Sequence, residues 1–131
     1  MAAQRARAEL LVENLANADT TRTPEGGPYR RKDVVFESTS VSSPFASVFS
    51  SQLESMGGVA VSDVVTDMSD PEHRYLPGHP DADKDGYVAF PKINPAEDMV
   101  DLMGAARSYG ANVSAIAAVK DMIQRSLDLA R

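Results

Sequence analysis

Residues 94–129 decide the fold, and they read NPAEDMVDLMGAARSYGANVSAIAAVKDMIQRSLDL. Asn94 can cap a helix, Pro95 suits the first helical position, and Glu97 stands three residues after the cap, as in a capping box. Two sets of residues then recur every seven positions: Met99, Ala106, Val113, Lys120 and Leu127, and Leu102, Tyr109, Ile116, Ile123 and Ala130. This heptad spacing predicts one helix from about Pro95 to Leu129.

A helix of this length is expected to need a partner helix. It would span roughly 50 Å at 1.5 Å per residue, which is more than a domain of this size requires. The nearest candidate is an N-terminal helix over about residues 2–16, but that helix is less than half as long. We therefore expect part of the heptad face to stay uncovered in the monomer and to pack on other subunits. The residues of this seam are Leu102, Tyr109, Val113, Ile116, Ile123 and Leu127.

The chain between the two helices has the composition of strands and turns. A turn-rich segment is predicted at Thr23–Pro28 and a strand at Val34–Phe36. A serine-rich solvated linker is predicted over 37–55, with a possible short helix after Pro44. A strand or hairpin arm is predicted at Val59–Val65, followed by mostly turns over Asp70–Pro91 around a strand at Tyr87–Phe90.

The predicted fold class is α+β. The N- and C-terminal helices are expected to form a coiled-coil-like core, with a small β-rich insert between them. The expected division is an N-terminal helix over 1–20, an insert over 21–94 that contains the linker 37–55, and a C-terminal helix over 95–131.

Composition excludes several classes of function. The net charge of −6 argues against a nucleic-acid partner, because binding phosphates requires clustered Lys and Arg. The chain has no cysteine and therefore no thiolate chemistry. No stretch approaches the roughly 20 apolar residues of a membrane span, so direct insertion into a membrane is not expected.

One segment resembles a metal site. Asp81–Gly86 matches the first half of a calcium-binding EF-hand loop, but Lys92 stands where the bidentate glutamate should be. We interpret the segment as a tight turn, and a small calcium-binding module remains an alternative. The two histidines, His73 and His79, fit no triad, so no catalytic residue, metal ligand or cofactor is predicted and the chain is not expected to be an enzyme.

A second polar segment ends the N-terminal helix. Its residues are Asn14, Leu15, Ala16, Asn17, Ala18, Thr20 and Thr21. Asn14 and Asn17 are three residues apart and share a helix face, so both can form hydrogen bonds to neighbouring groups. We interpret the segment as an assembly element whose hydrogen bonds lie between subunits. The alternative is a plain helix C-terminus whose polar residues satisfy the last carbonyls.

The same segments resemble a known family in their order along the chain. NLANADTT (14–21) resembles the N-terminal signature of flagellar rod and hook proteins. TPEGGPYRRK (23–32), HPDAD (79–83) with its continuation to Pro91, and ARSYGANV (106–113) are similar to proximal rod proteins of the FlgC type.

The resemblance implies a structural subunit of the flagellar basal-body rod, which spans the periplasm and serves cell motility. It implies terminal helices that form the inner tube, with other rod subunits and further copies of the chain as partners. It also implies passage through the flagellar type III export apparatus and no cofactor. A soluble helical adaptor that uses the same heptads for an unrelated partner remains the competing interpretation.

Overall fold

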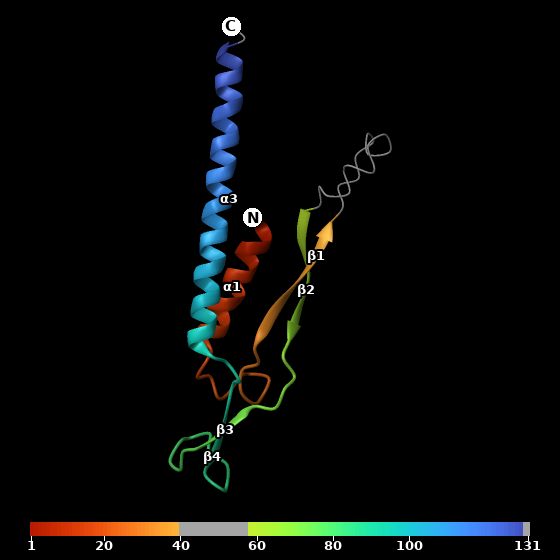
Figure 1. Ribbon diagram of the computed structural model, residues 1–131. Helices are drawn as coiled ribbons and strands as arrows, with labels where there is room; N and C mark the ends of the chain where they lie inside the picture. Colours follow the sequence, from red (N-terminus) through yellow and green to blue (C-terminus); the bar gives the residue numbers. More distant parts are fainter. Residues whose placement is uncertain (40–57, 130–131) are drawn as a thin grey trace.

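The structure, a computed structural model, describes residues 1–39 and 58–129. The elements are α1 (Ala2–Ala16), β1 (Lys32–Thr39), β2 (Gly58–Thr66), β3 (Glu72–Tyr75), β4 (Tyr87–Phe90) and α3 (Pro95–Leu129). Figure 1 shows α1 lying beside the first half of the much longer α3, with the β1–β2 hairpin on the other side of α1 and the β3–β4 hairpin at the end opposite the C-terminus. The predicted α+β class, with terminal helices around a β-rich insert, is confirmed.

Helix α3 has the predicted bounds. Its start is capped because the Asn94 Oδ1 accepts a hydrogen bond from the Ala96 N–H at 3.2 Å. Glu97 and Asp98 in the first turn complement the positive end of the helix dipole. Only the first turns are covered: Asp98 and Ala105 are buried and Leu102 is half-buried, whereas every residue from 106 to 129 is exposed.

The coiled-coil-like core is not confirmed. Among the described elements α3 packs on α1 alone, and it does so through the face of Asp98, Leu102 and Ala105. Met99 and Ala106, which head the first heptad set, are exposed instead. Small side chains at Ala3 and Ala105, both buried, let the two helices approach closely at this face. Ala130 lies outside the described residues.

Strands β1 and β2 form an antiparallel hairpin that runs from Lys32 opposite Thr66 to Thr39 opposite Gly58, with a bulge at Val35/Phe36. The predicted strands at Val34–Phe36 and Val59–Val65 are confirmed. The prediction that the solvated linker begins at Glu37 was wrong for residues 37–39, because their pairing with 58–60 extends β1. The rest of the predicted linker and the possible helix after Pro44 lie outside the described residues.

Strands β3 and β4 form a second, shorter antiparallel hairpin, from Glu72 opposite Phe90 to Tyr75 opposite Tyr87. The sequence predicted β4 but described the β3 segment as turns. All four β3 residues are exposed, so the apolar alternation that indicates a strand is missing and only the pairing with β4 defines it. Gly86, at φ +82°, makes the tight return possible, because a Cβ there would lie 2.9 Å from the Tyr75 ring.

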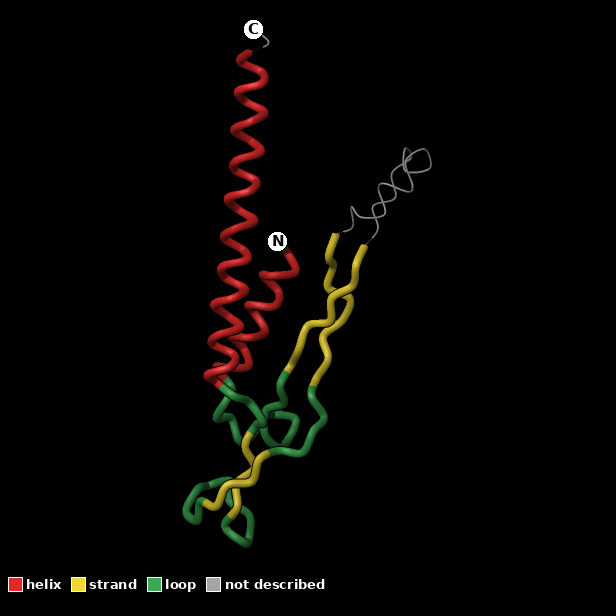
Figure 2. Tube along the Cα trace, in the orientation of Figure 1, coloured by secondary structure: helices red, strands yellow, loops and turns green. Residues whose placement is uncertain are grey.

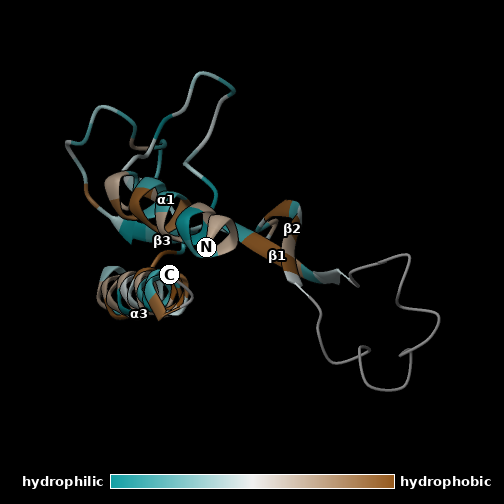
Figure 3. Ribbon diagram, turned by 90° about the horizontal axis from the view of Figure 1, so that it is seen from above, coloured by the Kyte–Doolittle hydropathy of each residue, from teal (hydrophilic) through white to brown (hydrophobic). Residues whose placement is uncertain are grey.

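The buried core of the described residues is small and draws on α1, the loop that follows it, β4 and the start of α3. Its apolar members are Ala3, Leu11, Tyr29, Val88, Phe90 and Ala105. Figure 2 shows the loops of this junction gathered below the helices, and Figure 3, the view from above, shows α1 between α3 and the β1–β2 hairpin. Neither described helix combines the length and the apolar content needed to cross a membrane.

Candidate assembly surface

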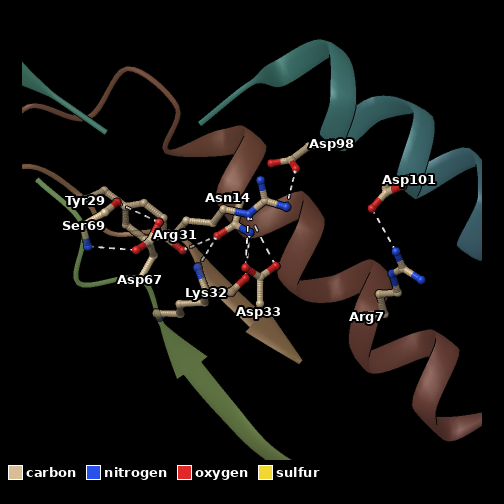
Figure 4. A network of polar contacts seen from close by, with 10 residues as sticks. All are labelled: Arg7, Asn14, Tyr29, Arg31, Lys32, Asp33, Asp67, Ser69, Asp98 and Asp101. Atoms are coloured by element: carbon tan, nitrogen blue, oxygen red, sulfur yellow. Dashed lines mark hydrogen bonds and ion pairs between the residues drawn. The ribbon is translucent and has the colours of Figure 1, made fainter. Parts of the chain in front are cut away.

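Asn14 is the centre of a buried polar cluster that joins α1 to β1. Its side chain is fully buried, and its amide donates to the Lys32 carbonyl at 2.9 Å while its Oδ1 accepts from the Lys32 N–H at 3.0 Å. The Tyr29 hydroxyl donates to the same Oδ1 at 3.0 Å (Figure 4). The amide therefore pairs with one residue of β1 as a neighbouring strand would, and it fixes the hairpin against the helix.

Asn17 and Thr20 form hydrogen bonds at the C-terminal end of α1. The Asn17 amide donates to the Glu13 carbonyl at 2.9 Å, and its Oδ1 accepts from the Thr20 hydroxyl at 3.1 Å. These bonds satisfy a carbonyl of the last turn, as the plain helix terminus would. Both amides form hydrogen bonds within the chain, and a role of this segment between subunits stays a prediction.

The end of the same segment reaches the turn that resembles a calcium loop. The Thr21 hydroxyl donates to Asp81 Oδ2 at 2.8 Å, and the Arg22 guanidinium lies 3.7 Å from Asp81 Oδ1. Asp83 Oδ1 accepts from the N–H groups of Asp85 and Tyr87, both at 2.9 Å. These two carboxylates hold loops together within the chain, as expected of a tight turn, and the geometry gives no support to the calcium-binding alternative.

Arg31 connects the start of α3 to the hairpin. Its guanidinium lies 3.2 Å from Asp98 Oδ1 and 3.3 Å from Asp33 Oδ2. Asp98 is 1% exposed, and burial raises the pKa of its carboxyl, although the charge of Arg31 acts in the opposite direction. The Arg7 guanidinium donates to Asp101 Oδ2 at 2.8 Å one turn further on (Figure 4). The first turns of α3 are thus held by charged contacts from α1 and from the residue that precedes β1.

The ionisation of Tyr29 makes the stability of the buried cluster depend on pH. Burial, together with the nearby Glu13 carboxylate, raises its pKa to about 12. Because this exceeds the ordinary value of about 10, the stabilisation it provides is complete below pH 10 and is lost as the pH rises toward 12.

We therefore expect Tyr29 to titrate near pH 12 in the folded chain, about two pH units above the ordinary value for a tyrosine. A spectroscopic titration of phenolate absorbance measures this, and Tyr29→Phe should remove the late step. Four tyrosines that titrate together near pH 10 would contradict the buried cluster.

The seam lies on the outside of the molecule over most of its length. Leu102 is half-buried beside α1, but the other five members are exposed: Tyr109, Val113, Ile116, Ile123 and Leu127, at 42–64% of their surface. Apolar side chains that recur on one face over five turns of a bare helix are typical of an interaction surface. No tertiary contact within the described residues covers this face.

Sequence reasoning did not find the charged partners of the junction. Asp98 looks like an ordinary first-turn acid, and only the packing of α3 on α1 buries it against Arg31. Tyr29 and Lys32 were quoted for the family resemblance but were not connected with Asn14. The stretch 23–32 could have indicated Tyr29 and Lys32 as partners of Asn14. Its turn-rich part, Thr23–Pro28, can return the chain toward the end of the N-terminal helix.

Comparison with known proteins gives consistent similarities. The family of flagellar basal body rod FlgEFG protein C-terminal domains matches residues 84–129. The flagellar basal-body rod protein FlgC of Bacillus subtilis is 42% identical over 100% of this chain and 91% of its own length. Those of Borreliella burgdorferi and Salmonella typhimurium are each 38% identical, over 97% and 98% of this chain and 88% and 89% of their own lengths.

Proposed function

We propose that this chain, which belongs to the FlgC family of flagellar basal-body rod proteins, assembles through the exposed seam of α3. The chain is a structural, non-enzymatic subunit of that rod. The observation that carries the proposal is the continuous exposure of residues 106–129 in an otherwise folded chain. An apolar helix face of this length is unfavourable in water, and a neighbouring subunit would remove it from solvent. An adaptor for an unrelated partner would have the same face, but membership of the rod family favours rod neighbours.

The heptad spacing suggests the form of this contact. Because α1 covers only the first turns of α3, a coiled-coil-like pairing of the seam would use helices of neighbouring subunits, either further copies or other rod proteins. Both heptad sets continue beyond the end of α1 without a break, which supports a helix as the partner.

The Asn14–Thr21 segment would serve assembly indirectly. Its two asparagines and Thr21 are engaged within the chain, so they set the angle between α1, the first loop and the turn at Asp81. Leu15 and Ala18 are half-buried in the same junction, and Ala16 is exposed. In this proposal the segment gives the subunit the shape that neighbours recognise.

The flagellar type III export apparatus is the proposed route to the rod. Passage through a narrow channel requires an unfolded chain, and this subunit has a small core and a terminal helix that is exposed from residue 106 to residue 129. Such segments unfold at low cost.

Hydrogen exchange tests the assembly proposal. In the free chain we expect amides of residues 112–129 to exchange quickly and those of residues 99–105 to be protected, because only the latter pack on α1. In isolated basal bodies residues 112–129 should become protected as well. Equally fast exchange of residues 112–129 in the free chain and in the rod would refute assembly through the seam.

A further inference from the structure

Two neighbouring hollows run along the junction of β1 with the two helices. The first, of about 270 Å³, is lined by Leu10 and Leu11 from α1 and by Val34 and Phe36 from β1. Its charged lining residues are Arg7, Lys32, Asp33 and Asp101. The second, of about 420 Å³, lies between β1 and the start of α3 and also includes Asp33 in its lining. Because they share Asp33, we treat them as one channel and call it the junction groove.

The junction groove changes character along its length. The part next to α1 has an apolar wall of Leu10, Leu11, Val34 and Phe36 beside two acids and two bases. The register of the hairpin places Val61 and Val64 on the same face as Phe36 and Val34, which extends the apolar wall beyond the groove. The part near the start of α3 is acidic, with Asp33, Asp67, Glu72 and Glu97 against Arg31 and Lys92. A fitting occupant is therefore an amphipathic helix that carries a basic residue on its apolar face.

The C-terminal half of α3 has these properties. Its two heptad sets are apolar except for Lys120, the one charged residue among them. A lysine at such a position destabilises a purely apolar interface and selects the register in which it meets an acid. The sequence provides no acid at heptad positions to meet it, whereas the groove does.

The charge of residues 58–129 is unevenly distributed along the chain. Residues 58–105 contain ten acidic and three basic residues, a net charge of −7, whereas residues 106–129 contain three basic and two acidic residues, a net charge of +1. The acidic part includes the β3–β4 end, and the weakly basic part is the protruding half of α3 at the opposite end (Figure 1). Copies aligned head to tail therefore bring unlike charges together.

The occupant must come from another molecule. Lys120 lies nineteen residues after Asp101, which lines the groove, so it is about 28 Å further along a straight helix. One patch that binds a different patch of an identical chain gives an open-ended series instead of a closed dimer. Such a series is compatible with a rod.

We propose that the junction groove of one copy receives the C-terminal half of α3 from a second copy, with Lys120 beside Asp33 and Leu127 beside Phe36. The two pairs agree in distance, because seven helical residues and three strand residues each advance by about 10 Å. Asp33 and Phe36 both line the first hollow. The inference rests on the proposed function and specifies which surface meets the seam.

Cysteine cross-linking tests the contact, since the chain has no cysteine of its own. The variant Asp33→Cys/Lys120→Cys, as the sole copy in the cell, should give a ladder of disulfide-linked oligomers of this chain when assembled rods are oxidised. Each single variant can give at most a dimer. Lys84→Cys/Lys120→Cys is the matched control, because Lys84 lies in the exposed turn before β4, and it should give no ladder.

A second variant, Phe36→Cys/Leu127→Cys, tests the same placement of the helix in the groove without altering a charge. It should also give a ladder of disulfide-linked oligomers. Cross-links only to a different rod protein would overturn the second copy as occupant. Absence of a ladder from both pairs in motile cells would overturn the groove. Neither result alters the assembly proposal, which the exchange of residues 112–129 in the rod reports separately.

Discussion

Replacing Ile116 with aspartate is expected to abolish incorporation into the rod while leaving the free chain folded. Ile116 is 58% exposed and lies in the centre of the uncovered part of the seam, so its replacement removes no contact within the monomer. In the rod the same position would be buried, and an unpaired buried charge costs about 3–5 kcal/mol. A loss of that size corresponds to a weakening of association by roughly a hundredfold or more.

The measurement combines swimming and the recovery of rods with the circular dichroism of the purified chain. Ala118→Asp is the matched control, because it adds the same charge to the same bare part of α3 but lies two residues on, on the opposite face of the helix. We expect the control variant to swim. Normal swimming of the Ile116→Asp variant would remove the seam from the assembly surface.

Replacing Asn14 with alanine is expected to lower the free energy of unfolding by about 3 kcal/mol. The change leaves the partly buried N–H and carbonyl of Lys32 and the buried Tyr29 hydroxyl without this partner. This value revises both expectations from sequence: bonds between subunits would leave the stability of the monomer unchanged, and a plain helix C-terminus would lose at most about 1 kcal/mol. The revision follows from the three hydrogen bonds and the complete burial of the side chain.

Urea denaturation of the purified chain measures the effect, and Asn17→Ala is the control. Asn17 is only half-buried and satisfies the helix end, so its replacement should cost about 1 kcal/mol. Asn14→Asp should fall between wild type and Asn14→Ala, because a carboxylate still accepts from the Lys32 N–H and the Tyr29 hydroxyl but cannot donate to the Lys32 carbonyl. Equal stability of Asn14→Ala and the wild type would contradict the buried cluster.

Local sequence patterns were enough to predict helix α3 and strands β1 and β2. The cap at Asn94, the proline after it and the heptads defined α3 to the residue, and the β-branched runs located β1 and β2. The mismatch in length between the helices, 15 residues against 35, was enough to predict that most of α3 would be bare. Family membership was readable as well, because the similar segments are contiguous stretches in a fixed order.

Contacts between distant segments were decided only in the tertiary structure. Strand β3 has no pattern of its own and exists through its pairing with β4, and Glu37–Thr39 form a strand because β2 returns alongside them. Asn14 was visible as a polar residue on a helix, but whether its amide faces a neighbouring subunit or the Lys32 backbone depends on where the chain goes after the Thr23–Pro28 turn. Asp98 became a buried partner of Arg31 for the same reason: burial is a property of packing, and spacing along one helix does not contain it.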